Sequence, residues 1–140
     1  MHCSNQLFAE SGNYHKRMAK AENKSPLHPY YTFIINYPLM FIYNVTTKIN
    51  WHIHDAWVKW MKGKHIPDVM NSGYFTDYRF VRILEIDDSE GPTYASQFYT
   101  ETLDRYSNYL ELYAPALRKD VLDNWGDNFI SFRSLMEVVN

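Results

Sequence analysis

The stretch FIYNVTTKI, residues 41–49, alternates its side chains as an extended strand does. Its odd-numbered residues, from Phe41 to Ile49, would share one face, and its even-numbered residues, from Ile42 to Lys48, the other. β-branched and aromatic residues dominate the odd-numbered set, which is typical of a pleated surface packed on a core. The stretch therefore predicts a strand whose odd-numbered face is buried.

A helix is predicted directly after this strand. Asn50 can cap its amino-terminal end. Pro67 has no backbone N–H to donate, so a straight helix should stop at Ile66 and a second short turn should follow. The residues at helical spacing along this segment are Ile53, Trp57, Trp60, Met61 and Lys64.

Two further strands and a second helix are predicted next. Residues 75–86 and 93–99 read as strands, and the polar turn between them, residues 87–91, joins them as an antiparallel hairpin. The second helix can begin at a cap formed by Thr100 or Thr102. Its inner residues are Leu103, Tyr106, Leu110 and Tyr113, continued by Leu117, Val121 and Trp125.

The end of the chain completes a recognisable order of elements. Pro115 should kink or restart the second helix, Gly126 can end it, and residues 130–139 read as the last strand. The order is therefore βαββαβ, which is the ferredoxin-like arrangement. The sequence predicts an α+β domain in which a four-stranded antiparallel sheet carries both helices on one face.

The uncovered face of this sheet is predicted to be half apolar, and a second copy of the chain is the simplest cover for it. One register error or one bulge in a strand would exchange its two faces, so the assignment depends on the register. Strand alternation places on this face the polar residues Asn44, Thr46, Arg79, Gln97 and Arg133 and the apolar residues Ile42, Val81 and Leu135.

Composition and charge exclude several classes of function. The net charge of −2 leaves no basic footprint for nucleic acid and does not suit an anionic membrane surface. No apolar run reaches the roughly 18 residues that a membrane span needs. Cys3, the single cysteine, can form neither an internal disulfide nor a structural zinc cluster. The expected location is the cytoplasm.

The first 39 residues differ from the rest of the chain. They are rich in Ser, Asn, Lys and Glu, and they lack a sustained strand or helix period. Such a segment buries too little apolar surface to offset the entropy lost on ordering. We therefore expect residues 1–39 to be a disordered or mispredicted extension and residues 40–140 to be the single folded domain. The alternative is a short added strand over residues 31–37.

Separated blocks of the domain carry a resemblance to a known family. The blocks are MFIYNVT (40–46), WVKWM (57–61), HIPDVM (65–70), GYFTDYR (73–79), DSEG (88–91), APALR (114–118), WGD (125–127) and FRSLMEV (132–138). In this order they closely resemble a family of short bacterial proteins known only as a domain of unknown function. The resemblance covers essentially all of residues 40–140, and it implies a start at Met40, where members of that family begin.

The fold implied by the resemblance is similar to that of the dimeric α+β barrel group. That group includes cofactor-free antibiotic-biosynthesis monooxygenases, EthD-like proteins and stress-responsive barrel proteins, so the resemblance implies a homodimer without a bound cofactor. In EthD-like members a His-x-Pro element commonly ends the first helix, and His65-Ile66-Pro67 looks like it. The group contains enzymes with different reactions, so fold membership assigns no activity.

His65 is the candidate catalytic residue, because histidine exchanges protons near neutral pH. The carbonyl groups at the end of the first helix would favour its charged form. The alternative is a packing histidine that bonds a helix carbonyl. His52 and His54 have no third ligand at a recognisable spacing, so no metal site is expected.

The candidate ligand-binding residues are Asn44, Arg79, Gln97, Arg133 and Trp60. The two arginines and the glutamine are predicted to converge in a cavity of the sheet. Paired hydrogen bonds from arginine there would hold a carboxylate or an enolate-type ligand. The alternative is that each arginine pairs with a nearby acid, such as Asp77 or Glu137, and that the tryptophan belongs to the core.

Two functions are compatible with these patterns. The first is a homodimer that binds a small organic molecule between sheet and helices, with His65 handling protons and Arg79 and Arg133 anchoring the ligand. The resemblance adds a cofactor-independent monooxygenase-like or isomerase-like reaction of an enolisable molecule. The second is a non-enzymatic structural or partner-binding homodimer. Nucleic-acid binding on the open sheet has aromatic residues in its favour, but the basic groove that it needs is missing.

Overall fold

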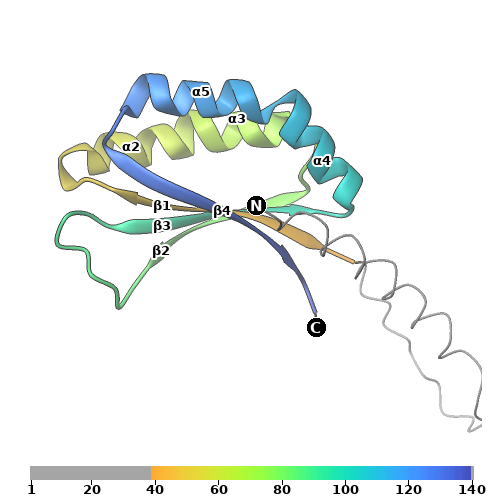
Figure 1. The fold of residues 1–140 in the computed structure, drawn as a ribbon, viewed down its shortest axis with the longest axis horizontal. Coiled ribbons are helices and arrows are strands. Elements are labelled where there is room, and N and C mark those ends of the chain that lie inside the picture. Colours follow the sequence, from red (N-terminus) through yellow and green to blue (C-terminus); the bar gives the residue numbers. More distant parts are fainter. Residues whose placement is uncertain (1–38, 140) are drawn as a thin grey trace, which may run out of the picture. The chain divides into compact units, whose positions relative to one another are not determined.

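The computed structural model describes residues 39–139, in which strands and helices follow in the order βαββαβ (Figure 1). The four strands form one antiparallel sheet in the order β2-β3-β1-β4, so the predicted ferredoxin-like fold is confirmed. The strands are β1 (Phe41–Ile49), β2 (Asp77–Ile83), β3 (Thr93–Thr100) and β4 (Phe129–Glu137). The expectations for the amino-terminal extension, including the alternative strand over residues 31–37, lie outside the described residues.

Strand β1 is central to the sheet, because it pairs with both β3 and β4. Its odd-numbered residues face the helices, as the sequence predicts, and Tyr43 and Ile49 are almost fully buried. An aromatic cluster forms on this face, and each of its ring pairs adds about 0.5–1.5 kcal/mol to the stability given by burial alone. The rings lie with centroids 4.7 to 6.3 Å apart and belong to Tyr43, Phe75, Phe98 and Tyr109.

The first helical run continues through Pro67, where the sequence predicted a break. It comprises η1 (Trp51–Ile53), α2 (His54–Trp60), the π turn η2 (Met61–His65) and α3 (Ile66–Asn71). Pro67 has no N–H for the carbonyl four residues earlier, and the wider π turn lies where that hydrogen bond would be missing. Because the π turn holds an extra residue, Met61 is followed on the buried side by Ile66, and Lys64 is exposed. Asn50 precedes the run, but its side chain makes no capping hydrogen bond.

The second helical run restarts at Pro115, which is one of the two predicted outcomes. It comprises α4 (Leu103–Leu112) and α5 (Ala114–Trp125). Thr102 caps α4 by accepting a hydrogen bond of 3.2 Å from the backbone N–H of Arg105. Tyr109 is the buried residue of α4. Two residues expected on the inner stripe are instead exposed: Leu103 and Tyr113.

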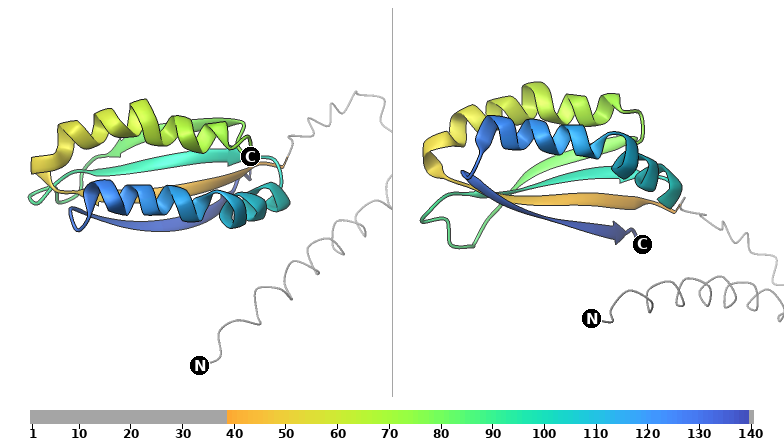
Figure 2. Two further views of the ribbon diagram at one scale, coloured as in Figure 1. Left: turned by 90° about the horizontal axis from the view of Figure 1, so that it is seen from above. Right: turned by 45° about the horizontal axis from the view of Figure 1, so that its top comes forward.

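All of these helices lie on one face of the sheet, and the two runs lie side by side over it (Figure 2). Helix α5 lies over β4, and the first run lies over the opposite half of the sheet. Lys64 of η2 joins the runs through an ion pair of 2.7 Å with Asp120 of α5. Within residues 39–139, the structure contains no helix with the length and apolarity to cross a membrane.

The register of β4 differs from the prediction. Arg133 lies opposite Val45 and Leu135 lies opposite Tyr43, so both residues face the helices. The prediction was wrong because β4 carries polar and apolar residues on both faces, so its own alternation does not fix the buried side. The strand pairing places Asn44, Thr46, Arg79 and Gln97 on the open face, as predicted. It also places four residues of β4 there, namely Ile130, Phe132, Ser134 and Met136.

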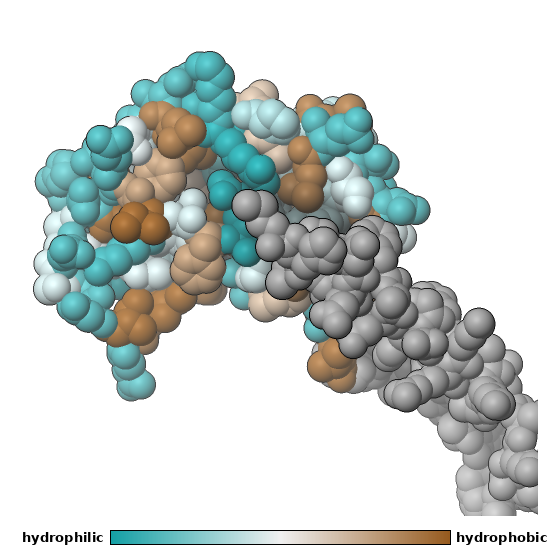
Figure 3. All heavy atoms as spheres, viewed as in Figure 1, coloured by the Kyte–Doolittle hydropathy of each residue, from teal (hydrophilic) through white to brown (hydrophobic). Residues whose placement is uncertain are grey.

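The open face presents apolar side chains to solvent. Ile130 is 75% exposed, Phe132 is 64% exposed and Val81 is 43% exposed. Figure 3 shows hydrophobic atoms, in brown, along the lower margin of the domain, which is the side away from the helices. Exposed apolar groups gathered on one face are typical of a surface that another protein covers.

Gly91 precedes β3 at a position that leaves no room for a side chain. A Cβ there would lie 1.6 Å from the carbonyl oxygen of Ile49. We predict that Gly91→Ala lowers the free energy of unfolding by about 2–3 kcal/mol, measured by urea denaturation. Gly63→Ala is the control, because an added Cβ at that position meets no atom within 4 Å beyond the local backbone of its own helix. An equal loss of stability in both variants would contradict the steric explanation.

Candidate functional site

A cavity of about 50 Å³ lies between the sheet and the helices, in the layer where the sequence analysis expected a ligand. Its sheet side includes Val45 and Arg133, and its helix side includes His65 and Arg118. A cavity of this size has room for a few water molecules or for a small polar group. Polar residues from η2, α5 and β4 therefore meet at one place.

His65 reaches this cavity from the π turn. Its ring stacks on that of Trp60, with ring centroids 5.0 Å apart. The ring of Trp60 in turn packs edge-on against that of Trp125 in α5, with ring centroids 5.7 Å apart. Burial lowers the pKa of His65 to about 4, although Asp120 and Asp68 act in the opposite direction. The expectation that a helix end favours the charged form is wrong, because the run continues into α3. The imidazole is therefore neutral near pH 7.

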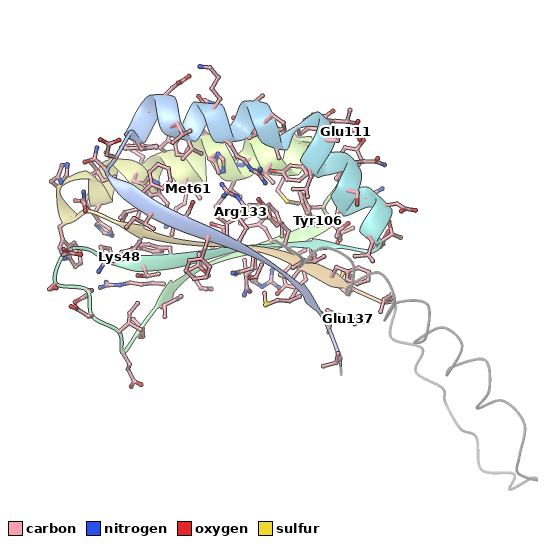
Figure 4. The ribbon with its side chains drawn as sticks, in the orientation of Figure 1. Lys48, Met61, Tyr106, Glu111, Arg133 and Glu137 are labelled. Carbon is pink, nitrogen blue, oxygen red and sulfur yellow. The ribbon has the colours of Figure 1, made fainter. Side chains whose placement is uncertain are left out.

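Arg133 points from β4 into the same layer, where Met61 and Tyr106 also lie (Figure 4). Arg118 of α5 lines the cavity with it, and the sequence analysis missed this residue. The signal was present, because Arg118 is four residues after the buried Ala114 and three before Val121, which is the spacing of one helix face.

Hydroxyl groups complete the polar lining of the cavity. They belong to Tyr43, Thr47, Ser96, Tyr109 and Ser131. Burial raises the pKa of Tyr109 well above its usual range, so this hydroxyl keeps its proton at neutral pH and can donate a hydrogen bond. The cavity is therefore rich in hydrogen-bond donors.

The remaining candidate ligand-binding residues lie on the other face of the sheet. Asn44, Gln97 and Arg79 are directly opposite one another on neighbouring strands, and Ser134 extends this line to β4. We call these four residues the polar row. Asn44 donates to Ser134 Oγ at 3.3 Å, and Arg79 pairs with Asp77 at 2.7 Å, as the alternative interpretation predicted. The sheet separates the polar row from His65 and Arg133.

The histidines near the start of the first run have other partners. His54 Nε2 lies 2.8 Å from the Tyr94 hydroxyl, and its Nδ1 lies 2.7 Å from an Asp55 carboxylate oxygen. In the part of the chain that the structure describes, no three His, Cys, Asp or Glu side chains are grouped so that they could hold a metal ion.

The sequence of the domain identifies its family. Residues 40–139 match DUF4286, which is described as a domain of unknown function. The chain belongs to the DUF4286 family. The resemblance stated from the sequence blocks is thus confirmed. A search of curated proteins gives no match to the chain.

Solved structures show what this DUF4286 domain resembles in fold. A protein of the ethyl tert-butyl ether D (EthD) family from Bacillus halodurans is 14% identical, with a TM-score of 0.52 over 71% of this chain and 98% of that one. A monooxygenase from Streptomyces coelicolor, solved with the ligand nanaomycin D, is 12% identical, with a TM-score of 0.50 over 74% of this chain and 90% of that one. At these identities the likeness concerns the fold alone.

The neutral, buried imidazole predicts a pH dependence of stability. The pKa of His65 is about 4 in the folded chain against 6.5 for an unperturbed histidine, so the unfolded state binds more protons between these values. The associated stabilisation is complete above pH 6.5 and is lost as the pH falls through 4.

We therefore predict that, between pH 7 and pH 4, the wild-type chain loses up to about 3 kcal/mol more unfolding free energy than His65→Gln does. Urea denaturation across this pH range measures the difference. His52→Gln, at an exposed histidine, is the control and should keep the wild-type profile. Superimposable profiles for the wild type and His65→Gln would disprove the assignment.

Proposed function

We propose that this domain is a homodimer that binds a small organic molecule in the cavity between sheet and helices. The observation that carries the proposal is the cavity, which His65 of η2 and Arg133 of β4 both line. Arg133 would anchor the ligand, and His65 would accept a proton from it. Trp60 would hold the imidazole in place through the stacking contact.

A neutral imidazole beside a guanidinium suits proton transfer at an enolisable carbon. The C–H bond next to a carbonyl breaks, and its proton passes to a ring nitrogen of His65. The electron pair moves onto the carbonyl oxygen, where Arg133 stabilises the negative charge. Return of the proton to another carbon completes an isomerisation, whereas an oxidation would use dioxygen as the electron acceptor. The fold shared with a monooxygenase supports this class of reaction by analogy.

A second candidate is the structural or partner-binding homodimer. The size of the cavity favours it, because about 50 Å³ is well below the roughly 300–1,000 Å³ of a typical ligand pocket. In this case the dimer contact would be the function, and His65 would pack against Trp60 without handling protons.

Deuterium exchange separates the two candidates. The full chain is incubated in D₂O with pyruvate or with hydroxyacetone, two small enolisable ketones, and loss of their exchangeable C–H signals is followed by NMR. We expect the wild type to accelerate exchange and His65→Gln to reduce this acceleration at least about tenfold. His52→Gln is the control and should retain it. No acceleration by the wild type, or equal rates with His65→Gln, would favour the structural homodimer.

The open face supports the homodimer. Its charged side chains are paired within the chain, since Lys48 lies 3.4 Å from Glu90 and Arg79 lies 2.7 Å from Asp77. Two such faces can meet around a two-fold axis without bringing unpaired like charges together. The exposed apolar residues of β4, above all Phe132, would then be covered by the second copy.

We predict that the full chain has twice its monomer mass in solution and that Phe132→Asp reduces this mass to that of the monomer, measured by light scattering after gel filtration. The new carboxylate would have to be desolvated in the interface, whereas it costs little on an exposed monomer surface. Leu122→Asp is the control, because Leu122 is also exposed but belongs to α5 on the helix side. A monomeric wild type would rule out the dimer.

A further inference from the structure

Three buried nitrogen atoms in the described domain have no hydrogen-bond partner, and they lie in one region. They are His65 Nδ1, Arg118 Nε and Trp125 Nε1. His65 and Arg118 line the cavity, and Trp125 is connected to His65 through the ring of Trp60. Arg118 Nε and Trp125 Nε1 are donors, whereas Nδ1 of the neutral His65 is a donor in one tautomer and an acceptor in the other. Each unpaired buried donor costs about 1–3 kcal/mol, so such a group in a native structure calls for an explanation. A bound acceptor would remove part of this cost.

The charged side chains that line the cavity are all positive. Arg118 and Arg133 both line it, and none of its lining residues is an aspartate or a glutamate. The two acids whose charges act on His65, Asp68 and Asp120, each pair with the ammonium group of Lys64, at 2.8 and 2.7 Å. The guanidinium groups of the half-buried Arg118 and the exposed Arg133 thus border a space whose lining offers no counter-charge, and this arrangement favours an anion.

We infer that the ligand of this cavity is a small anion of the carboxylate or enolate type and that Arg118 binds it together with Arg133. This inference rests on the proposed binding function of the same cavity and specifies the class of its ligand. A guanidinium offers parallel N–H donors that match the two oxygens of a carboxylate. The Nε–H of Arg118 is one such donor without a partner in the protein, and the hydroxyls of Tyr109 and Ser131 are further donors in the lining.

The cavity volume is consistent with this chemistry. About 50 Å³ accommodates the head group of a small acid, not a bulky organic molecule. The inference also has a consequence for His65, which faces Arg133 and Lys64 as positive groups and Asp120 and Asp68 as negative groups. An anion between the guanidinium groups and the imidazole would stabilise the protonated ring, so the ligand should raise the pKa of His65.

Acetate and acetamide form a matched pair of probes, because they differ in charge and hardly in shape. The full chain is titrated with each at constant ionic strength, and binding is followed through the indole NMR signal of Trp57, which lines the cavity. We expect acetate to shift this signal saturably and acetamide to leave it unchanged. Arg118→Gln should weaken acetate binding about 10- to 100-fold, as loss of a charge-assisted contact does. The NMR-measured pKa of His65 should rise with acetate in the wild type.

Lys119→Gln is the control variant. It also removes one positive charge, and from the neighbouring residue, but Lys119 is exposed and pairs with Asp123 away from the cavity lining. It should keep the wild-type affinity for acetate. Equal binding of acetate and acetamide, no acetate shift, or equal weakening by both substitutions would overturn the anion assignment. If the anion assignment failed in this way, exchange of hydroxyacetone protons would still support the proposed function. The anion assignment and the proposed function can therefore fail separately.

Discussion

The missing N–H of Pro67 is the constraint on which the site depends. A proline at this place cannot donate to the carbonyl of Gly63, and the chain widens into a π turn rather than ending the helix. The extra residue changes which side chains face inward. Lys64 is exposed and binds Asp120 on α5, whereas His65 lines the cavity. A single backbone irregularity thus both joins the two helical runs and positions the candidate proton acceptor.

Local signals in the sequence were sufficient for the fold. The alternation over residues 41–49, the cap at Thr102 and the restart at Pro115 each act within a few residues, and each is present in the structure. The site depends on non-local features. The face of Arg133 follows from the pairing of β4 with β1, and its own strand carries polar and apolar residues on both sides. Only His65 and Arg133 of the predicted polar candidates therefore share the cavity.

The cavity is difficult to explain as an ordinary part of the core. A core built only for stability would replace the half-buried Arg118 and the neutral His65 with apolar residues of similar volume, because unpaired buried polar groups oppose folding. Tyr43, Phe98 and Tyr109 of the aromatic cluster already belong to the cavity lining. Natural proteins retain unfavourable groups chiefly where a site requires them. The unpaired polar groups of this lining, which apolar packing does not require, are therefore an argument for function at the cavity.

The two faces of the sheet carry polar groups for different physical reasons. On the helix side Arg133 has Val45 opposite it and no paired acid among residues 39–139, whereas Arg79 in the polar row is paired with Asp77. Satisfied polar groups suit an interface, because they can be buried without loss of charge compensation. The neighbouring rung on the open face contains Val81, Ala95, Thr46 and Phe132, so the polar row adjoins a largely apolar band. If the second copy were shifted by one rung, apolar groups would lie against the polar row. This unfavourable contact would disfavour the shifted arrangement, so the two subunits should pair in a single register.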